Sequence, residues 1–321
     1  MRGLSFRYRS NGPVTPSLPG RRRALRALSL LALLAPTFAP AQRLAPSYEL
    51  RVLTGPESPV TRQIVQALAR RVPRLQSSSD IKALAARPGH AIYLTISPAA
   101  LEAALAAELD RPIISVFASS SAFHARLSQA PRSRPPVTAI YAEVSPAHQM
   151  ELIWRIYQRR LTVGVLLSED TAFLRPLLRE AAAANGLDLQ VEDVGPSVDV
   201  VRALARVASA SVLLAVPDHR IYTTINLFTI LESTYRRGRA LVGFSTALVA
   251  AGALAAAYAS IEDTIAHLEE VVEATAAGRP PDPQFPRYWR VAFNDNVASS
   301  LDIVVDDAAR SLGNRPPAKR Q

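Results

Sequence analysis

The sequence predicts an α/β protein made of two doubly wound parallel-sheet lobes, joined by a hinge that the chain crosses more than once. Three observations support this fold class. Short apolar runs alternate with amphipathic helical patterns along most of the 321 residues. Several of these runs end in Ser, Thr or Gly, as parallel strands do at a ligand-binding edge. Hydrophobic residues make up 49% of the chain, which is enough to bury two cores.

Residues 1–41 have the features of a secretory signal peptide. Three arginines at residues 21–23 precede an apolar run at residues 28–34 that is too short to span a bilayer. Ala39-Pro40-Ala41 supplies small residues for cleavage before Gln42. We therefore expect a periplasmic protein, exported by this N-terminal signal. The chain has no cysteine, so it can form no disulfide and no lipid-modified Cys at the cleavage point.

The formal net charge of +10 is concentrated in this first segment. Residues 1–41 hold seven arginines and no acid, and subtracting them from the 37 basic residues leaves 30 against 27 acidic ones. Binding to nucleic acid needs a basic patch on the folded part, so we expect no nucleic-acid partner. A transcription repressor is also disfavoured, because an export signal stands where a helix-turn-helix would be.

The mature chain opens with a predicted strand–turn–helix unit. Residues 48–55 form a strand, Ser58 caps the helix over residues 60–72, and Pro59 takes its first position. Further strands are predicted at residues 91–96, 112–117 and 137–141, with a helix over residues 97–109 after the first of them. These strands form the parallel sheet of a first lobe.

A second alternating set begins with a helix that Ser145 caps. Strands are predicted at residues 162–167, 187–194, 211–216 and 240–244, and helices at residues 173–185, 198–208 and 221–235. A small-residue run at 255–259, a helix at 261–277, a strand at 290–293 and a last helix from Asn294 complete the chain.

We expect the chain to cross between the lobes near residues 142, 250 and 288. The first lobe then comprises residues 42–142 and 250–287, and the second comprises residues 143–249 and 288–321. Several crossings of this kind make a hinge about which two lobes can close on a ligand.

The chain resembles, over roughly residues 48–305, ABC-transporter substrate-binding proteins with the type I periplasmic-binding fold. The resemblance rests on four motifs in order: Val242-Gly243-Phe244-Ser245, Gly252-Ala253-Leu254, Gly278-Arg279-Pro280-Pro281 and Phe293-Asn294-Asp295-Asn296-Val297-Ala298. It implies a periplasmic protein that captures a small-molecule ligand between its lobes for an ABC permease in the inner membrane. An alternative is the same fold used as an extracytoplasmic sensor or accessory ligand-binding protein without transport.

The sequence departs from the family near the ligand. The family commonly has Asn-Val-Thr-Gly near the first crossing, where this chain has Pro136-Val137-Thr138-Ala139-Ile140. The family's Tyr-Gly motif after the hinge is replaced by Ala257-Tyr258-Ala259-Ser260-Ile261. The ligand of the relatives is therefore not carried over to this chain.

The candidate ligand-binding residues follow the predicted strands. Hydroxyls and helix N–H groups at the carboxyl ends of the strands suit a small polar ligand. Asp218 suits a ligand amine. Tyr141, Tyr222 and Phe117 could form a wall on which an apolar or aromatic ligand stacks. The alternatives are that the hydroxyls and Asp218 are helix N-caps and that the aromatic rings are core. The predicted ligand-binding set is Thr54, Ser97, Ser119, Ser120, Tyr141, Asp218, Tyr222 and Ser245.

Catalytic and metal sites are not expected. The chain has no Gly-x-Ser-x-Gly motif and no phosphate-binding Gly loop, and its five His are not at metal-ligand spacing. A Ser-His-Asp set can be drawn from residues 119–121, His124 and Asp218, but the spacing does not favour it over helix caps. We therefore expect a monomeric binding protein that is not an enzyme and has no cofactor and no metal.

Overall fold

The computed structural model describes residues 48–72, 75–87, 89–131, 134–195, 197 and 199–318. These residues belong to one compact unit, Ala45–Gln321. The predicted signal peptide, residues 1–41, lies outside the described residues, so the cleavage site before Gln42 stays a prediction.

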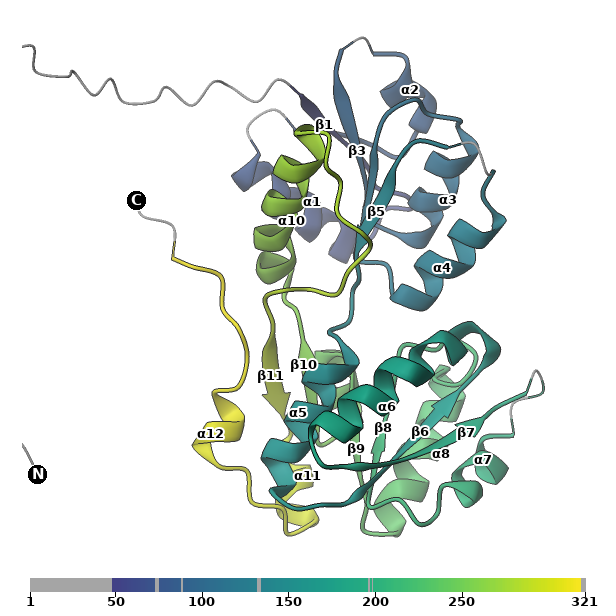
Figure 1. The fold of residues 1–321 in the computed structure, drawn as a ribbon, viewed down its shortest axis with the longest axis vertical. Coiled ribbons are helices and arrows are strands. Elements are labelled where there is room, and N and C mark those ends of the chain that lie inside the picture. The colour runs from purple at the N-terminus through teal and green to yellow at the C-terminus, as the bar shows by residue number, and fades with distance from the viewer. Residues whose placement is uncertain are drawn as a thin grey trace, which may run out of the picture. The chain divides into compact units, whose positions relative to one another are not determined.

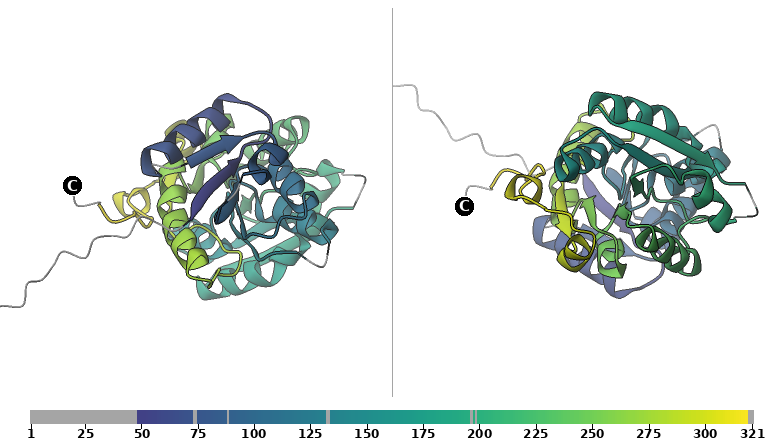
Figure 2. Two further views of the ribbon diagram at one scale, coloured as in Figure 1. Left: turned by 90° about the horizontal axis from the view of Figure 1, so that it is seen from above. Right: turned by 90° about the horizontal axis from the view of Figure 1, so that it is seen from below.

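The first lobe is built on a five-stranded sheet in the order β2-β1-β3-β4-β5, in which each neighbouring pair is parallel (Figure 1). Helices cover both of its faces, as expected for a doubly wound sheet (Figure 2). The strands are β1 (Glu49–Leu53), β2 (Leu75–Ser78), β3 (Ala91–Thr95), β4 (Ile113–Val116) and β5 (Val137–Ile140). The helices are α1 (Pro59–Arg71), α2 (Ile81–Ala85), α3 (Pro98–Ala106), α4 (Ser120–Gln129) and α10 (Ile261–Ala276).

Two apolar clusters form the core of this lobe. On one face, Ile64 and Leu68 of α1 and Ile265 and Leu268 of α10 pack on the strands. On the other face, Leu84, Leu101 and Phe123 come from α2, α3 and α4. The alternation of strand side chains between these clusters follows the two-residue period of a strand.

The second lobe is built on a six-stranded sheet in the order β11-β10-β9-β8-β6-β7, and β11 is antiparallel to β10. Its strands are β6 (Thr162–Leu167), β7 (Asp188–Asp193), β8 (Val212–Leu214), β9 (Ala240–Gly243), β10 (Ala255–Tyr258) and β11 (Arg290–Phe293). Its helices are α5 (Pro146–Tyr157), η1 (Glu169–Leu174), α6 (Arg175–Ala184), α7 (Val200–Arg206), α8 (Thr224–Arg236), α9 (Thr246–Ala251), α11 (Asp295–Ser300) and α12 (Asp307–Arg310).

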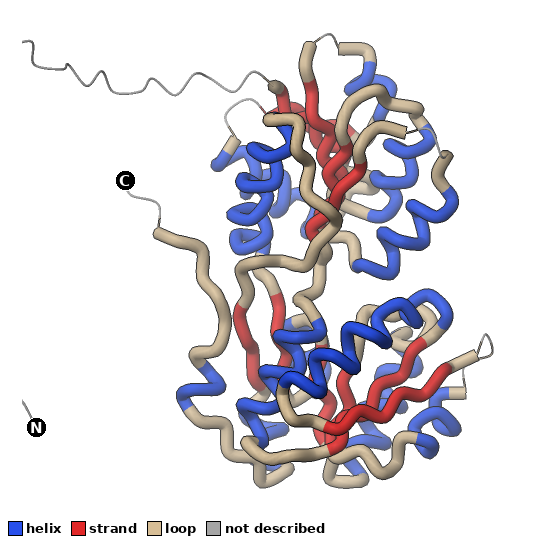
Figure 3. The backbone as a smooth tube through the Cα atoms, viewed as in Figure 1, coloured by secondary structure: helices blue, strands red, loops and turns tan. Residues whose placement is uncertain are grey.

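The chain passes between the lobes at three places, seen as loops in Figure 3. The first follows β5, the second lies between β10 and α10, and the third lies between Gln284, which bonds to the first lobe, and β11. The predicted crossing near residue 250 is therefore too early. β10 pairs with β9 in the second sheet, whereas α10 packs on the first, so the crossing falls near residue 259. Residues 250–258 belong to the second lobe.

The directions of the strands set where a ligand can bind. β5 runs toward the first crossing and is parallel to β4, and β10 runs toward the second crossing and is parallel to β9. The carboxyl ends of both sheets therefore lie on the side of the crossings, where loops and helix N-termini of the two lobes meet (Figure 1).

Candidate functional site

The candidate site lies at this meeting of carboxyl ends, which we call the interlobe edge. It is formed by residues 54–55, 97, 117–121 and 141–143 of the first lobe or its first crossing, and by residues 168–173, 217–222 and 244–245 of the second. Parallel α/β sheets bind ligands outside the carboxyl ends of their strands.

A serine turn at the start of α4 joins the two lobes. Ser119 caps α4 by accepting a hydrogen bond from the Ala122 N–H at 3.2 Å, and its hydroxyl lies 3.0 Å from that of Ser121. Ser121 Oγ then donates to the Pro217 carbonyl at 2.9 Å, across the lobes. The structure thus brings residues 119–121 to the segment that contains Asp218.

Glu143, which the sequence analysis did not single out, is the buried acid of the interlobe edge. It is 4% exposed, and the Ser120 N–H donates to its two carboxylate oxygens at 3.0 and 3.2 Å. Ser120 Oγ also donates to Glu143 Oε1. Burial raises the pKa of Glu143 and outweighs the hydrogen bonds from Ser120, which act in the opposite direction. Its place in the first crossing, between Ala142 and Val144, is the sequence signal that could have identified it.

Asp218 has a structural role that differs from both predicted ones. Its carboxylate accepts four hydrogen bonds, from the Ser168 N–H (3.1 Å), Thr171 Oγ1 (2.6 Å), the Arg220 N–H (3.0 Å) and the Ile221 N–H (3.2 Å). A carboxylate has about four acceptor positions, so none is left for a ligand amine. Asp218 does not cap the next helix either, because α8 begins at Thr224 with Thr223 as its N-cap.

These bonds also decide the charge of Asp218. Burial alone would raise the pKa of this carboxyl, but the hydrogen bonds from Ser168, Thr171 and Arg220 outweigh burial and hold it below its usual range. Asp218 therefore ties the end of β6 to the loop after β8 as a carboxylate.

Three of the other predicted hydroxyls have local partners. Ser97 caps α3 and Ser245 caps α9, each by accepting a backbone N–H, and Thr54 Oγ1 donates to the Gly55 carbonyl at 3.2 Å. These contacts match the helix-cap alternative for Ser97 and Ser245. Thr54 also lines a groove of about 470 Å³ on the first lobe, together with residues 77–79 and Arg62. The groove is lined by one lobe alone.

The two predicted tyrosines lie in different surroundings. Tyr141 is 5% exposed, its hydroxyl lies 3.2 Å from His124 Nε2, and burial raises its pKa to about 12. His124 in turn lies against Phe173 of η1, with ring centroids 4.6 Å apart, and so forms a second contact between the lobes. Tyr222 packs in the second lobe beside Phe244, and its buried hydroxyl has no hydrogen-bond partner among the described residues.

Phe117 marks backbone strain at the same edge. It has a φ of 61°, in the left-handed region that bulky residues avoid, at the end of β4 and directly before the serine turn. Strained residues persist where the surrounding structure holds them, and they cluster at ligand-binding sites.

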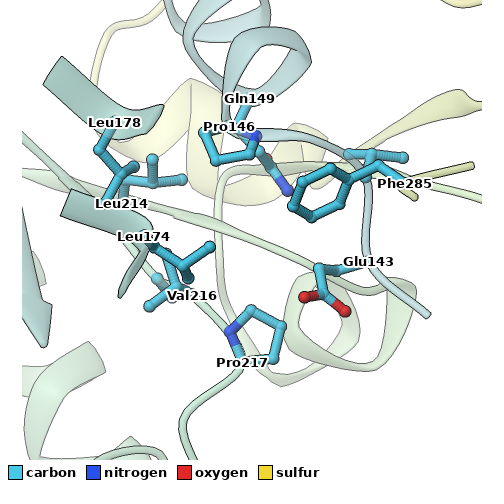
Figure 4. Close-up of a pocket in the computed structure, with 11 residues that line it drawn as sticks. Glu143, Pro146, Gln149, Leu174, Leu178, Leu214, Val216, Pro217 and Phe285 are labelled. Atoms are coloured by element: carbon cyan, nitrogen blue, oxygen red, sulfur yellow. The ribbon is translucent and has the colours of Figure 1, made fainter. Parts of the chain in front are cut away.

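A small cavity lies beside Glu143 at the end of β8 (Figure 4). Its volume of about 10 Å³ corresponds to roughly one water-sized group. Glu143 and Gln149 supply its polar side chains, and its walls are otherwise apolar: Val144, Pro146, Leu174, Leu178, Leu214, Ala215, Val216, Pro217 and Phe285.

The described residues contain no group of three or more His, Cys, Asp or Glu placed to hold a metal ion. Within the same ranges, no helix has the length and apolar character needed to cross a membrane.

No protein-family model matches the sequence, and no curated protein matches it either. Solved structures do match the fold. An ABC domain in complex with L-Trp from Streptococcus pneumonia has 17% identity and a TM-score of 0.57, over 83% of this chain and 98% of that one. A ligand-free, open substrate-binding protein with adhesive properties from Clostridium difficile has 17% identity and a TM-score of 0.60, over the same shares. A conserved domain protein from Vibrio cholerae has 20% identity and a TM-score of 0.55. As the resemblance in the sequence implied, the chain has the two-lobed type I periplasmic-binding fold of ABC-transporter substrate-binding proteins.

Proposed function

We propose that this protein captures a small molecule at the interlobe edge and delivers it, in the periplasm, to an ABC permease of the inner membrane. The observation that carries the proposal is the meeting of two strand-end edges around buried polar groups, with Ser121 bonded to Pro217 across them. One of the similar structures is a substrate-binding protein and another is an ABC domain in complex with L-Trp, which supports ligand capture.

The ligand residues that we keep in the proposal are Ser119, Ser120 and Tyr141, because they lie in the segments that join the lobes. Thr54, Ser97, Tyr222 and Ser245 would contribute from the rims of the two lobes. Asp218 would act indirectly, by holding the loop that faces the serine turn. The groove beside Thr54 is larger than the cavity beside Glu143, but a ligand bound in it would touch one lobe and would not close the hinge.

A screen for ligand-driven closure tests the proposal. The protein without residues 1–41 is screened against small metabolites by thermal shift, and each hit is then followed by small-angle scattering. A ligand at a hundredfold excess over its Kd stabilises the folded state by about 2.7 kcal/mol. We expect a hit that both raises Tm and reduces the radius of gyration. Tight ligands that leave the radius of gyration unchanged would count against capture between the lobes.

The alternative is a sensor or accessory protein with the same fold and no transport role. Reconstitution of the protein with a permease in liposomes distinguishes a transport role from a sensing role. A transport protein loaded with its ligand stimulates ATP hydrolysis by a cognate permease in liposomes, whereas a sensor does not.

A further inference from the structure

Arg287 is the residue at which the third crossing passes from the first lobe to the second. Its N–H donates at 3.2 Å to Nδ1 of His267 on α10, a helix of the first lobe. Its carbonyl accepts a hydrogen bond at 3.0 Å from Nδ2 of Asn314, which follows the segment that packs Leu312 on the core of the second lobe. Asn314 also pairs with Trp289 through two backbone hydrogen bonds of 2.9 and 3.0 Å. The backbone of Arg287 is therefore bonded to both lobes.

The bond to His267 is the buried connection between this crossing and α10. His267 is 1% exposed. Two side chains of the crossing also reach α10: Arg287 pairs with Glu270, and Tyr288 Oη donates to Glu270 Oε1 at 2.6 Å. The Arg287 side chain is exposed, so water screens its ion pair and reduces what the pair contributes.

His267 accepts the hydrogen bond from Arg287 only while its ring is neutral. Because Nδ1 is the acceptor, the single ring proton of the neutral form is on Nε2. A second proton would go to Nδ1 and would turn a donor toward the Arg287 N–H. That N–H would then lose its acceptor at a buried position, so the crossing would separate from α10 at this point.

The surroundings of His267 favour the neutral ring at neutral pH. Burial lowers the pKa of His267, and the charge of Arg287 acts in the same direction. Glu270 and Gln284 raise this pKa, but burial outweighs them. A protonated ring would compete with Arg287 for Glu270, which would weaken the second connection as well.

The other elements around this part of α10 add no charge that is directed at the ring. Tyr288 packs edge to face on His267, with ring centroids 6.4 Å apart. On α1, Arg71 pairs with Glu269 at 3.4 Å, and β5 has no titratable side chain. The response of the crossing to acid therefore depends on His267, Glu270 and Arg287.

We propose, resting on the closure of the lobes proposed above, that His267 makes the hinge sensitive to pH: protonation of its ring releases the third crossing from α10 and lets the lobes separate more freely. At neutral pH the crossing is fixed to both lobes. In acid it is fixed to the second lobe alone, through Asn314. A small molecule captured between the lobes would then be released more readily in acid.

Amide hydrogen exchange of residues 42–321, followed by NMR from pH 7.5 to 4.5 and corrected for the intrinsic rate, tests the local step. We expect the protection of the Arg287 N–H to fall by at least about fivefold in acid, because its hydrogen bond is lost. The Trp289 N–H, which donates to Asn314, should keep its protection and is the internal control. His267→Asn keeps a side-chain acceptor that takes up no proton in this range, so it should make Arg287 protection independent of pH. His90→Asn, at an exposed position of the first lobe, should respond as wild type does.

Spin labels on the two lobes test the effect on the hinge, at Ser128→Cys on α4 and Val201→Cys on α7, without ligand. We expect the distribution of label distances to be broader at pH 5 than at pH 7.5, and to stay unchanged between these values in His267→Asn. Glu143 and Asp218 are retained in that variant, so their titration is controlled for. Arg287 protection that does not change in acid, an equal loss in His267→Asn, or distances that do not respond to pH would each overturn the proposal. If the labels and Arg287 respond as expected while no ligand closes the lobes, the pH-sensitive hinge stands and ligand capture fails.

Discussion

Asp218 stabilises the second lobe through hydrogen bonds that a substitution would leave unmade. Asp218→Ala removes the acceptor of four buried donors, and we expect it to lower the free energy of unfolding by more than about 3 kcal/mol. Asp218→Asn keeps one oxygen but turns an NH₂ group toward the Ser168 N–H, so we expect a loss of about 1–3 kcal/mol. Urea unfolding at pH 7 measures both.

The pH dependence of this loss follows from the lowered pKa of Asp218. A carboxyl whose folded pKa lies below its unfolded value, about 3.9, contributes stability above that value. The contribution disappears as the pH falls through the folded pKa. The stability difference between wild type and Asp218→Ala should therefore shrink in acid below about pH 4, and a difference that stays constant to pH 2 would contradict this role.

Glu143 should show the opposite dependence, because burial raises its pKa. An acid whose folded pKa is raised contributes most stability below its unfolded value, about 4.3, and loses it as the pH rises through the folded pKa. Wild type should therefore gain stability relative to Glu143→Gln as the pH is lowered from 7 toward 4.5. Chemical unfolding at a series of pH values without ligand measures the difference, and parallel curves for the two proteins would contradict it.

The sequence could predict which residues lie at the ends of strands, but it could not predict the hydrogen-bond partners of their side chains. Ser97, Ser119 and Ser245 follow apolar runs, and that pattern is equally typical of helix caps and ligand sites. The partners of Asp218 are close in space and up to 50 residues away in sequence, so no local pattern reveals them. Glu143 was missed because a single acid in a connecting segment is usually solvated.

At the scale of elements, α10 and β11 are joined by an ion pair between the lobes. Arg290 on β11 donates from Nε and Nη2 to Asp263 in the first turn of α10, at 2.6 and 2.8 Å. Asp263 is fully buried and also belongs to a capping box with Ser260. Burial would raise the pKa of Asp263, but the bonds from Arg290 and Ser260 outweigh it and lower the pKa.

Removing one partner of this pair should destabilise the protein more than removing both. Arg290→Met leaves a buried carboxylate unpaired, and we expect a loss of about 3–5 kcal/mol in the free energy of unfolding. Asp263→Asn combined with Arg290→Met should recover part of that loss, because the buried charge is gone. Arg236→Met, at an exposed pair with Glu232, is the control and should change stability by less than about 1 kcal/mol. Equal losses in the single and double variants would mean that the pair does not act as a unit.

The same region explains why a lobe boundary was misplaced. The order of strands and helices is read from apolar periodicity, and this part of the prediction was correct for most elements. β10 reads Ala-Ala-Ala-Tyr, and alanine is depleted in strands, so its sequence does not show to which sheet it belongs. Its place is fixed by pairing with β9, the preceding strand, and with β11, which follows only after the whole of α10.

At the scale of the whole molecule, the two lobes are held by three covalent crossings and by weaker contacts at the interlobe edge. The contacts are the hydrogen bond from Ser121 Oγ to the Pro217 carbonyl and the ring contact between His124 and Phe173. In the proposed closure of the hinge, such contacts would favour adjacent lobes over separated ones. A ligand bound between the lobes, as proposed, would favour adjacent lobes further.

Ser121→Ala combined with Phe173→Ala should shift this equilibrium toward separated lobes. A hydrogen bond and an aromatic contact each contribute about 1 kcal/mol, so the two changes together should alter the population ratio by roughly 30-fold. Because the chain has no cysteine, Ser128→Cys on α4 and Val201→Cys on α7 provide one pair of positions for fluorescence labels. We expect a longer distance between the labels in the double variant without ligand. Saturating ligand should restore the wild-type distance with a reduced apparent affinity, since part of its binding energy then moves the lobes. If the distance is the same with and without the two side chains, the crossings and the ion pair between Asp263 and Arg290 set the position of the lobes, and the contacts at the interlobe edge do not contribute.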